Sequence, residues 1–254
     1  MVVSLSGKVA LVTGGSAGLG AAVARRLAGE GCAVAINYAS SADRARALAD
    51  EIAAEHGVRT LVLCGDVASE AVCRDLVERT VAELGRLDLV VSNAGWTRIV
   101  NFADLDGVTE HDFDKCYALN VKSHFWLFRA AKPHLASGDE EFGGSFLVTS
   151  SVAGLKPAGS SIPYAITKSA AVHLVKVLAK AHGPNIRVNA ICPSLLLTEW
   201  GKSFGPERIK AVTASLPLKR LPSLDDAADA FISTARNTSI TGSIIVVDSG
   251  MAVV

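Results

Sequence analysis

Short apolar runs alternate along the chain with longer stretches in which apolar residues recur at helical spacing. The short runs are rich in β-branched residues and nearly continuous in apolar character, which is typical of strands covered on both faces of a sheet. This pattern predicts seven strands, at Val9–Thr13, Ala33–Tyr38, Thr60–Cys64, Leu87–Ser92, Ser145–Thr149, Arg187–Ile191 and Ile244–Val247.

The longer stretches predict six helices, and glycines that could cap helix C-termini stand at 31, 57, 85 and 183. Alternating strands and helices favour right-handed βαβ units and a parallel sheet. We expect an α/β fold: a doubly wound, mostly parallel, seven-stranded Rossmann-like sheet with helices on both faces, residues 1–254 forming one domain. The predicted helices lie near 18–29, 42–55, 69–84, 109–135, 163–181 and 224–236.

Two segments interrupt the alternation. Residues Ser137–Gly144 are acidic and glycine-bearing, which predicts a solvated turn. Residues 193–222 contain four prolines and no clear period, and a loop this long in a compact domain is often a lid or a binding segment. We therefore expect the substrate loop near 193–222.

Composition excludes several classes of protein. Lys plus Arg equals Asp plus Glu at 25 each, so no global field attracts nucleic acid or an anionic membrane. The five cysteines are widely spaced without a CxxC pair, and the six histidines show no metal-ligand spacing, so we expect reduced thiols and no metal. The N-terminus lacks the features of a signal peptide and no apolar run reaches 18 residues, which favours a cytoplasmic protein.

A glycine-rich turn, Thr13–Gly20, follows the first predicted strand and opens the first helix. Glycines tolerate positive φ and let the backbone approach a pyrophosphate, while the helix N-terminus offers unpaired N–H groups. The spacing Gly-x3-Gly-x-Gly differs from the common dinucleotide fingerprint, but its place between strand and helix favours a phosphate site over an empty tight turn.

The carboxyl ends of other predicted strands carry residues suited to a nucleotide, and in such a sheet they meet in one crevice. Asp66 could accept a hydrogen bond from an adenine amino group, and small residues after the fourth strand would let a nucleotide lie against the backbone. Together with the glycine turn, the candidate cofactor residues are Gly14, Ser16, Gly18, Leu19, Gly20, Asn37, Tyr38, Ser40, Ser41, Asp66, Val67, Asn93, Ala94, Gly95, Tyr164, Lys168, Pro193 and Thr198.

The end of the second strand bears on the choice between the two nicotinamide cofactors. A carboxylate there would bond the adenosine 2′-hydroxyl and repel a 2′-phosphate. None occurs before Asp43, whereas Asn37, Ser40 and Ser41 could donate to a phosphate and Arg44 is the nearest cation. We predict NADP(H), with NAD(H) left open.

Tyr164 and Lys168 stand four residues apart on a predicted helix and so share a face, and Ser151 closes the strand before that helix. A phenol titrates near pKa about 10 in water, and a neighbouring cation would lower that pKa toward neutral pH. A serine hydroxyl could hydrogen-bond a substrate oxygen that gains negative charge. Spacing alone would also fit a chance Tyr-x3-Lys pair.

The chain resembles the short-chain dehydrogenase/reductase family over residues 8–250. The matching pieces occur in the family's order: TGGSAGLG (13–20), GDV (65–67), NAG (93–95), Asn120 in LNVKS, Ser151 in TSSVAG, YAITK (164–168), RVNAICP (187–193) and TGSIIVVDSG (241–250).

The resemblance implies a catalytic set of Ser151, Tyr164, Lys168 and Asn120. Tyr164 would be the general acid in ketone reduction, Ser151 would polarise the carbonyl, and Lys168 would bind the nicotinamide ribose and lower the tyrosine pKa. Asn120 would help to hold a water in a proton relay. For the cofactor it implies that Gly14, Gly18 and Gly20 line the pyrophosphate site, Asp66 the adenine, Asn93 the adenosine side and Thr198 the carboxamide.

The sequence also departs from the family's pattern. Ser194 stands where members usually carry glycine, and Ser16 and Ala17 stand where many NADP-dependent members carry a cation. The second departure weakens the NADP(H) prediction and leaves the fold untouched.

We expect an oxidoreductase that transfers a hydride between NADP(H) and a small-molecule carbonyl or secondary alcohol, with reduction favoured. A non-catalytic NADP(H)-binding sensor or scaffold and a non-redox biosynthetic step on the same fold stay open. Trp96, Trp200 and Phe204 follow strand ends or lie in the 193–222 segment and could wall an apolar substrate pocket, although loop packing would explain them equally well. Apolar positions on more than one stripe of the helices near 109–135 and 163–181 favour a homodimer or homotetramer.

Overall fold

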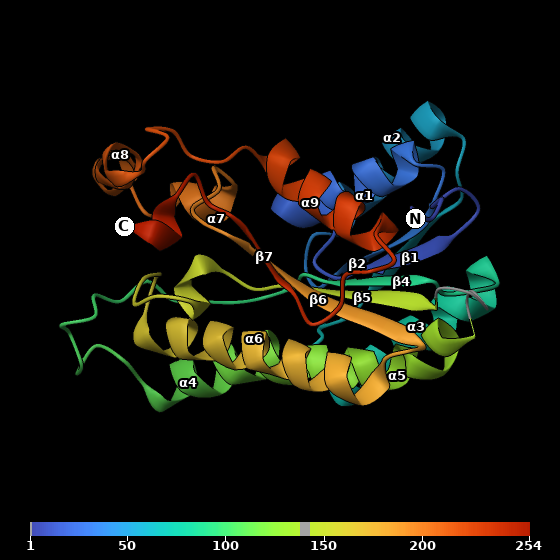
Figure 1. Cartoon of the computed structure of the whole chain (residues 1–254), viewed down its shortest axis with the longest axis horizontal. Helices are drawn as coiled ribbons and strands as arrows, with labels where there is room; N and C mark the ends of the chain where they lie inside the picture. Colours follow the sequence, from blue (N-terminus) through green and yellow to red (C-terminus); the bar gives the residue numbers. More distant parts are fainter. Residues whose placement is uncertain (1, 138–142) are drawn as a thin grey trace.

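The computed structural model describes residues 2–137 and 143–254 and shows one parallel sheet with helices on both faces (Figure 1). The strand order is β3-β2-β1-β4-β5-β6-β7, and every pairing is parallel. The chain reverses direction across the sheet between β1 and β4, where such folds bind ligands. The strands are β1 (Val9–Val12), β2 (Ala33–Tyr38), β3 (Thr60–Cys64), β4 (Leu89–Ser92), β5 (Gly144–Thr149), β6 (Ile186–Pro193) and β7 (Ile244–Val247).

Two helical layers enclose the sheet. Helices α1, α2 and α9 pack on one face and α3, α5 and α6 on the other, each layer with its own buried apolar cluster. The helices are α1 (Gly18–Gly29), α2 (Ala42–His56), α3 (Glu70–Leu84), α4 (Glu110–Tyr117), α5 (Ser123–Ala136), α6 (Ile162–His182), α7 (Glu199–Lys202), α8 (Pro206–Ser215) and α9 (Leu224–Arg236), with short turns η1 (Ala118–Lys122), η2 (Val152–Gly154) and η3 (Met251–Val253).

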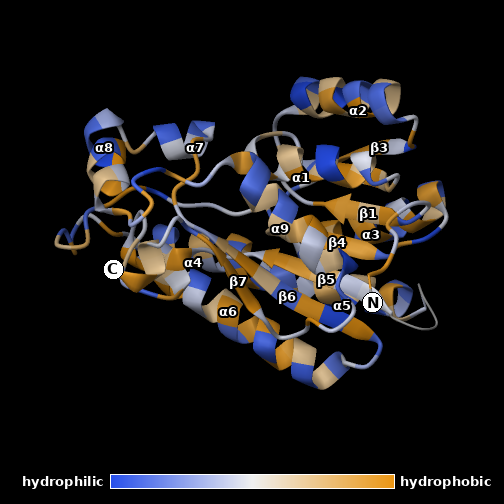
Figure 2. Ribbon diagram, turned by 45° about the horizontal axis from the view of Figure 1, so that its top comes forward, coloured by the Kyte–Doolittle hydropathy of each residue, from blue (hydrophilic) through white to orange (hydrophobic). Residues whose placement is uncertain are grey.

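Strand β1 shows why the sequences of the strands are almost entirely apolar. Ala10 and Val12 enter the cluster beneath α1, while Val9 and Leu11 enter the opposite cluster. Because side chains alternate between faces and both faces are covered, all four are buried. Figure 2 shows the same contrast, with apolar strands at the centre and mixed helices around them.

The fold confirms the predicted sheet and most helix boundaries but corrects two segments. The helix predicted over 109–135 is interrupted by η1, a π-helical turn between α4 and α5. The segment 193–222, expected to be irregular, contains α7 and α8. Helix α8 has no fully buried residue, and its apolar side chains Ile209 and Val212 are only partly buried, so its helical pattern is short and easily overlooked in a sequence.

Smaller expectations have mixed outcomes. Gly57 and Gly85 are left-handed C-caps, whereas Gly183 is extended at the end of α6. The five cysteines are free, four of them buried and Cys64 exposed. Most of the acidic turn predicted at Ser137–Gly144 lies outside the described residues. Within the described ranges no helix has the length and apolar character needed to span a bilayer.

Candidate active site

A cleft of about 1410 Å³ opens at the carboxyl ends of the strands. Its walls come from the glycine turn after β1, the ends of β2 to β6, the segment after β4, and helices α7 and α8. The candidate residues that line it are Gly14, Gly18, Leu19, Asn37, Ser40, Asp66, Val67, Asn93, Ala94, Gly95, Trp96, Ser151, Tyr164, Lys168, Pro193, Thr198, Trp200 and Phe204. The structure therefore gathers most of the predicted site into one crevice.

Five predicted residues do not line this cleft: Ser16, Gly20, Tyr38, Ser41 and Asn120. Gly20 lies beneath the turn, where a β-carbon would come within 2.3 Å of the Gly14 carbonyl oxygen. Its part in the site is to let α1 pack against the turn. Gly14 and Gly18 have φ of +60° and +54°, a region that glycine enters without strain.

The first turn of α1 faces the cleft in a form that suits a phosphate. Ala17, at the N-cap, provides no side-chain hydrogen bond, and the first turn carries no carboxylate. The N–H groups at this helix end are therefore not capped by a side chain, and the positive end of the helix dipole is not neutralised.

Asn37 is buried, and its side chain hydrogen-bonds the backbone of the glycine turn and of the segment after β3. Its Oδ1 accepts from Gly14 N at 3.3 Å, and its Nδ2 donates to Gly65 O at 3.0 Å and Leu63 O at 3.2 Å. Its amide hydrogens already bind the backbone in the chain by itself, and a bond from Asn37 to a cofactor phosphate stays a prediction. Asn93 has a related role, since its Nδ2 donates to Thr13 O at 3.0 Å.

The edge of the cleft near β2 carries an ion pair that joins two distant segments. Arg44 Nη1 lies 2.7 Å from Glu199 Oε2, and Arg44 Nη2 donates to Ser41 Oγ at 3.0 Å. Ser41 is thus engaged by Arg44, while Ser40 lines the cleft directly. The pair fixes the N-terminus of α7 to the start of α2.

Tyr164, Lys168 and Ser151 meet between α6 and the end of β5. Lys168 Nζ donates to Thr149 O at 2.8 Å and lies 5.5 Å from the centroid of the Tyr164 ring. The Ser151 side chain hydrogen-bonds the tyrosine. Ser161 caps α6 through the Tyr164 N–H at 3.4 Å, so the phenol leaves the first turn of a capped helix.

Burial controls the ionisation of these groups. It raises the pKa of Tyr164 to about 12, and the hydrogen bond from Ser151 offsets only part of that rise. Burial lowers the pKa of Lys168 to about 8. Near neutral pH Tyr164 is therefore a protonated phenol beside a largely protonated amine, and a lowering of the Tyr164 pKa by Lys168 stays a prediction.

Asn120 lies in the π-helical turn η1, and its side chain is fully engaged. Its Oδ1 accepts from Trp96 N and its Nδ2 donates to Trp96 O, both at 2.9 Å, and Nδ2 also approaches Thr167 Oγ1 at 3.1 Å. A β-carbon on Gly95 would lie 3.0 Å from Asn120 Oδ1 and 3.7 Å from Lys168 Nζ. Asn120 thus fixes the segment after β4 next to Lys168; a role in holding a water stays a prediction.

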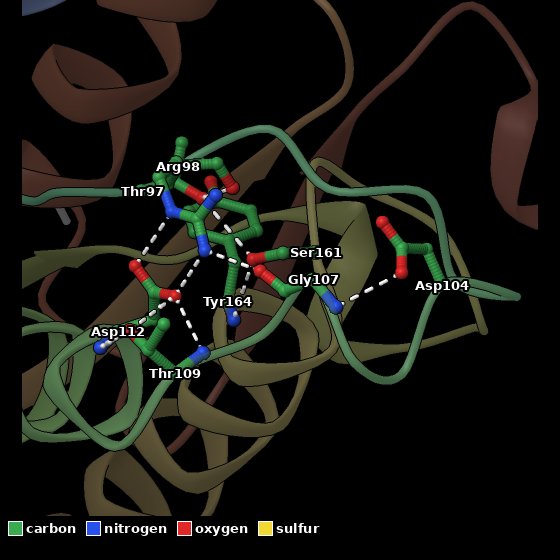
Figure 3. Close-up of polar contacts among 8 residues, drawn as sticks. All are labelled: Thr97, Arg98, Asp104, Gly107, Thr109, Asp112, Ser161 and Tyr164. Atoms are coloured by element: carbon green, nitrogen blue, oxygen red, sulfur yellow. Dashed lines mark hydrogen bonds and ion pairs between the residues drawn. The ribbon is translucent and has the colours of Figure 1, made fainter.

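The segment after β4, residues 97–109, lines the cleft with residues 99–102 and is fastened at two points, of which Figure 3 shows the polar contacts. Thr97 Oγ1 lies 2.6 Å from Ser160 Oγ and 3.4 Å from Ser161 Oγ, the residue that caps α6. Arg98 pairs with the buried Asp112 and also donates to Gly107 O at 2.5 Å. We call residues 97–109 the strap.

The segment 193–222 closes the opposite side of the cleft. A β-carbon on Gly18 would lie 3.1 Å from Thr198 Cγ2, so the start of α7 packs over the glycine turn. The Trp200 ring stands edge-on to Tyr164, with centroids 5.9 Å apart. Trp96 and Phe204 also line the cleft, so all three aromatic side chains suggested as pocket walls reach it. Ser194 fits without strain, its N–H donating to Val247 O at 3.1 Å.

Four side chains of the site had no sequence signal that singled them out. Lys115 and Arg208 line the cleft, Arg98 fastens the strap, and Thr13 Oγ1 accepts from Asn93 N at 3.0 Å. Thr13, Arg98 and Arg208 contact partners that only the folded chain brings close, namely Asn93, Asp112 and Gly159. Among the described residues no group of three His, Cys, Asp or Glu side chains could hold a metal ion.

The residues present fit a dinucleotide. The glycines leave room that β-carbons would fill, the uncapped start of α1 suits a pyrophosphate, and the cleft is long enough to join this region to Tyr164. Asp66 and Val67 at the end of β3 would face the adenine, and Lys168 the nicotinamide ribose.

Comparison with known proteins identifies the family. A profile of the family described as short chain dehydrogenase matches residues 8–208. A protein named ketoacyl reductase 2 of the granaticin polyketide synthase, from Streptomyces violaceoruber, is 40% identical over 251 residues, covering 95% of both chains. A versicolorin reductase of Emericella nidulans is 34% identical, covering 97% of this chain and 96% of its own.

Solved structures agree with this relationship. A short chain dehydrogenase from Burkholderia cenocepacia, in complex with NADP, superposes with a TM-score of 0.89 at 33% identity, covering 98% of this chain and 99% of that one. This chain belongs to the short-chain dehydrogenase/reductase family, a family of NAD(P)-dependent oxidoreductases.

Proposed function

We propose that this enzyme reduces a carbonyl group with NADPH, using Tyr164 as the proton donor. The observation that carries the proposal is the meeting of Tyr164, Ser151 and Lys168 in one cleft, with Lys168 Nζ 5.5 Å from the centroid of the Tyr164 ring. Burial raises the pKa of Tyr164 to about 12, so the phenol holds its proton at neutral pH and is ready to give it to a substrate oxygen that gains negative charge.

The side chains have separate tasks in this reaction. When bound, the cofactor supplies the hydride that adds to the carbonyl carbon. The carbonyl π electrons move to the oxygen, Tyr164 transfers its phenolic proton to that oxygen, and the products are an alcohol, NADP⁺ and a phenolate. The Ser151 hydroxyl, next to the phenol, would hydrogen-bond the same oxygen and stabilise its growing charge.

Lys168 would restore the proton that Tyr164 loses. Its amine has a pKa of about 8, so it is largely protonated at neutral pH yet able to exchange its proton. It lies 5.5 Å from the phenol ring centroid and is oriented by Thr149 O. As a cation it would also stabilise the phenolate.

NADP(H) is the cofactor that we propose, with NAD(H) as the alternative to be tested. The family relative from B. cenocepacia is a complex with NADP. In this chain Ser40 lines the adenosine edge of the cleft and Arg44 lies nearby, bonded to Ser41. A 2′-phosphate would find hydroxyl and guanidinium donors there.

For the substrate we propose a ketone carried on an apolar or aromatic skeleton. Trp96, Trp200 and Phe204 line the cleft and the apolar strap residues Ile99, Val100 and Phe102 contribute to it. The relatives named ketoacyl reductase and versicolorin reductase also favour reduction of a ketone.

The test is the oxidation of NADPH by the purified protein, followed by absorbance, with a panel of aromatic and β-keto ketones and with NADH in parallel. The proposal predicts ketone-dependent oxidation that is faster with NADPH at equal concentration. Tight binding of NADPH without oxidation across the panel would instead favour a cofactor-binding sensor, and conversion without a change in absorbance would indicate a non-redox step.

We also propose that the protein assembles as a homodimer or homotetramer through α4 and α6. These helices expose Phe113, Tyr117, Ile166 and Val177, each at least 43% accessible. Light scattering after size-exclusion chromatography tests this, and the mass of a single chain at micromolar concentration would contradict it.

A further inference from the structure

Two cations line the cleft outside the catalytic set: Lys115 on α4 and Arg208 on α8. Both helices lie at the same end of the molecule (Figure 1), and residues of the strap and of the 193–222 segment line the cleft. In the described part of the chain neither cation has a carboxylate within ion-pair distance. Arg44, Arg98 and Arg129, in contrast, each pair with an acidic side chain.

Each cation lies against an aromatic ring that lines the same cleft. Lys115 Nζ is 4.6 Å from the centroid of the Trp96 ring, and Arg208 Cζ is 4.7 Å from that of Phe204. A ring face holds a cation in place through its quadrupole without neutralising its charge. The charge of each therefore stays available to a ligand.

Both cations are also anchored close to the catalytic groups. Arg208 Nη2 donates to Gly159 O at 2.7 Å, and a β-carbon on Gly159 would lie 3.1 Å from the Tyr164 ring. The backbone of Trp96, which supports Lys115, is bonded on both sides to Asn120. A molecule whose carbonyl reached Tyr164 would thus pass these two cations.

The acidic residues that line the cleft do not pair with Lys115 or Arg208. They are Asp66, at the end of β3, and Glu199, which binds Arg44 at 2.7 Å. Asp66 is thus on the far side of the sheet's switch point from α8, and the carboxylate of Glu199 is already paired with Arg44. The substrate side therefore combines apolar and aromatic walls with uncompensated positive charge.

We propose that Lys115 and Arg208 bind an anionic group of the substrate, a carboxylate or a phosphate, and so select ketones that carry one. This inference rests on the proposed ketone reduction and adds the charge of the substrate to it. Arg208 offers a planar guanidinium that can donate two hydrogen bonds to an oxyanion, and Lys115 adds a second charge.

The experiment compares anionic ketones with neutral counterparts that keep the same reacting ketone: acetylbenzoate with its methyl ester, and an aromatic β-ketoacyl thioester of coenzyme A with its N-acetylcysteamine counterpart. The first pair tests a carboxylate and the second a phosphate-bearing carrier. In the wild-type protein at least one anionic ketone should have a KM about tenfold lower than its neutral partner.

The variants are Arg208→Gln, Lys115→Met and, as a control on the same helix as Arg208, Lys210→Met, an exposed residue that does not line the cleft. Arg208→Gln and Lys115→Met should each raise KM for the preferred anionic ketone about tenfold, change kcat less than twofold and leave the neutral ketone unaffected. Arg208→Lys should keep part of the preference, and Lys210→Met should behave as wild type.

Equal losses for charged and neutral ketones would overturn the proposal, since they would show that Arg208 only fastens α8 to Gly159. Equal KM values for charged and neutral ketones in the wild-type protein would overturn it as well. If no ketone is reduced, the proposed function fails separately from the proposed anion site. Quenching of Trp96 and Trp200 fluorescence by acetylbenzoate then still tests the anion site. Quenching that is lost in Arg208→Gln supports the site, and no quenching in the wild-type protein contradicts it.

Discussion

Arg98 binds Asp112 through both arms of its guanidinium and thereby fastens the strap to the N-terminus of α4 (Figure 3). The Asp112 side chain is 6% exposed and also accepts from Thr109 N and Oγ1, each at 2.8 Å, in a capping box. The pairing with Arg98 holds the pKa of Asp112 well below its usual range, with the hydrogen bonds from Thr109 acting in the same direction.

Arg98→Met should lower the free energy of unfolding at pH 7 by clearly more than the loss of an exposed ion pair does, because it leaves a buried carboxylate with only its Thr109 partners. Asp112 has a lowered pKa in the folded state, so its contribution is present above pH about 4 and fades as the pH falls below that. Urea denaturation at pH 7 and at pH 3.5 measures both effects.

Arg79→Met provides the control for Arg98→Met. Arg79 forms an exposed pair with Glu83 on α3 at 3.4 Å, and its loss should cost no more than about 0.5 kcal/mol. Equal losses in the two variants would show that the strap contact adds nothing to stability. The strap lines the cleft, so Arg98→Met should in addition raise KM for ketones.

The buried charge of Lys168 should lower the stability of the fold, although the proposed reaction needs this side chain. Burial lowers its pKa to about 8, so below that pH the folded state carries a buried cation, at a cost of about 3 kcal/mol relative to the unfolded chain. Lys168→Met should therefore unfold at an equal or higher temperature than the wild type while losing turnover. A clear drop in Tm would show that the bond to Thr149 O outweighs the buried charge.

The same pKa predicts the pH dependence of the reaction. Lys168 loses its proton as the pH rises through about 8, whereas Tyr164, with a pKa of about 12, keeps its proton throughout. The kcat/KM for ketone reduction should thus be level below pH 8 and fall about tenfold per pH unit above it. A level profile up to pH 9.5 would remove Lys168 from proton transfer.

Gly20→Ala should abolish cofactor binding, because its β-carbon would meet Gly14 O at 2.3 Å and Asn93 Nδ2 at 2.6 Å and displace the glycine turn. Gly29→Ala, at the other end of α1, is the matched control, since its β-carbon meets only His56 at 3.7 Å. NADPH fluorescence titration compares the two variants, and wild-type binding by Gly20→Ala would contradict the packing described for the turn.

Glu199→Gln should tighten NADPH binding about threefold and leave NADH binding unchanged. Glu199 binds Arg44 at 2.7 Å across an exposed edge of the cleft, and its neutralisation frees that guanidinium for a 2′-phosphate. Dissociation constants for both cofactors measure the effect; equal changes for NADPH and NADH would exclude Arg44 from phosphate recognition.

How far the sequence predicts this protein depends on whether the deciding interaction is local. Strands such as Val9–Val12 are predictable because burial on both faces leaves a continuous apolar run. Helix α8 has no fully buried residue and only a short apolar pattern at Ile209 and Val212. The π-helical turn at Ala118–Lys122 breaks a pattern that looks continuous in sequence.

The same distinction holds within the site. Tyr164, Lys168 and Ser151 are predictable from motif and spacing, but the pKa of the tyrosine is not, because burial by the folded chain reverses the shift that its lysine neighbour suggests. Asn37 looks like a free donor at a strand end, yet the fold turns its amide toward Leu63 and Gly65. Lys115 and Arg208 can be recognised as cleft residues only in the folded chain, where the helices that carry them both border the cleft.

The central claim is that Tyr164 donates the proton in carbonyl reduction. Single-turnover oxidation of bound NADPH by a ketone, compared between wild type and Tyr164→Phe, tests it most directly. We predict that Tyr164→Phe binds NADPH within twofold of wild type and reduces the ketone at least about 100-fold more slowly. A single-turnover rate equal to that of the wild type would contradict the account.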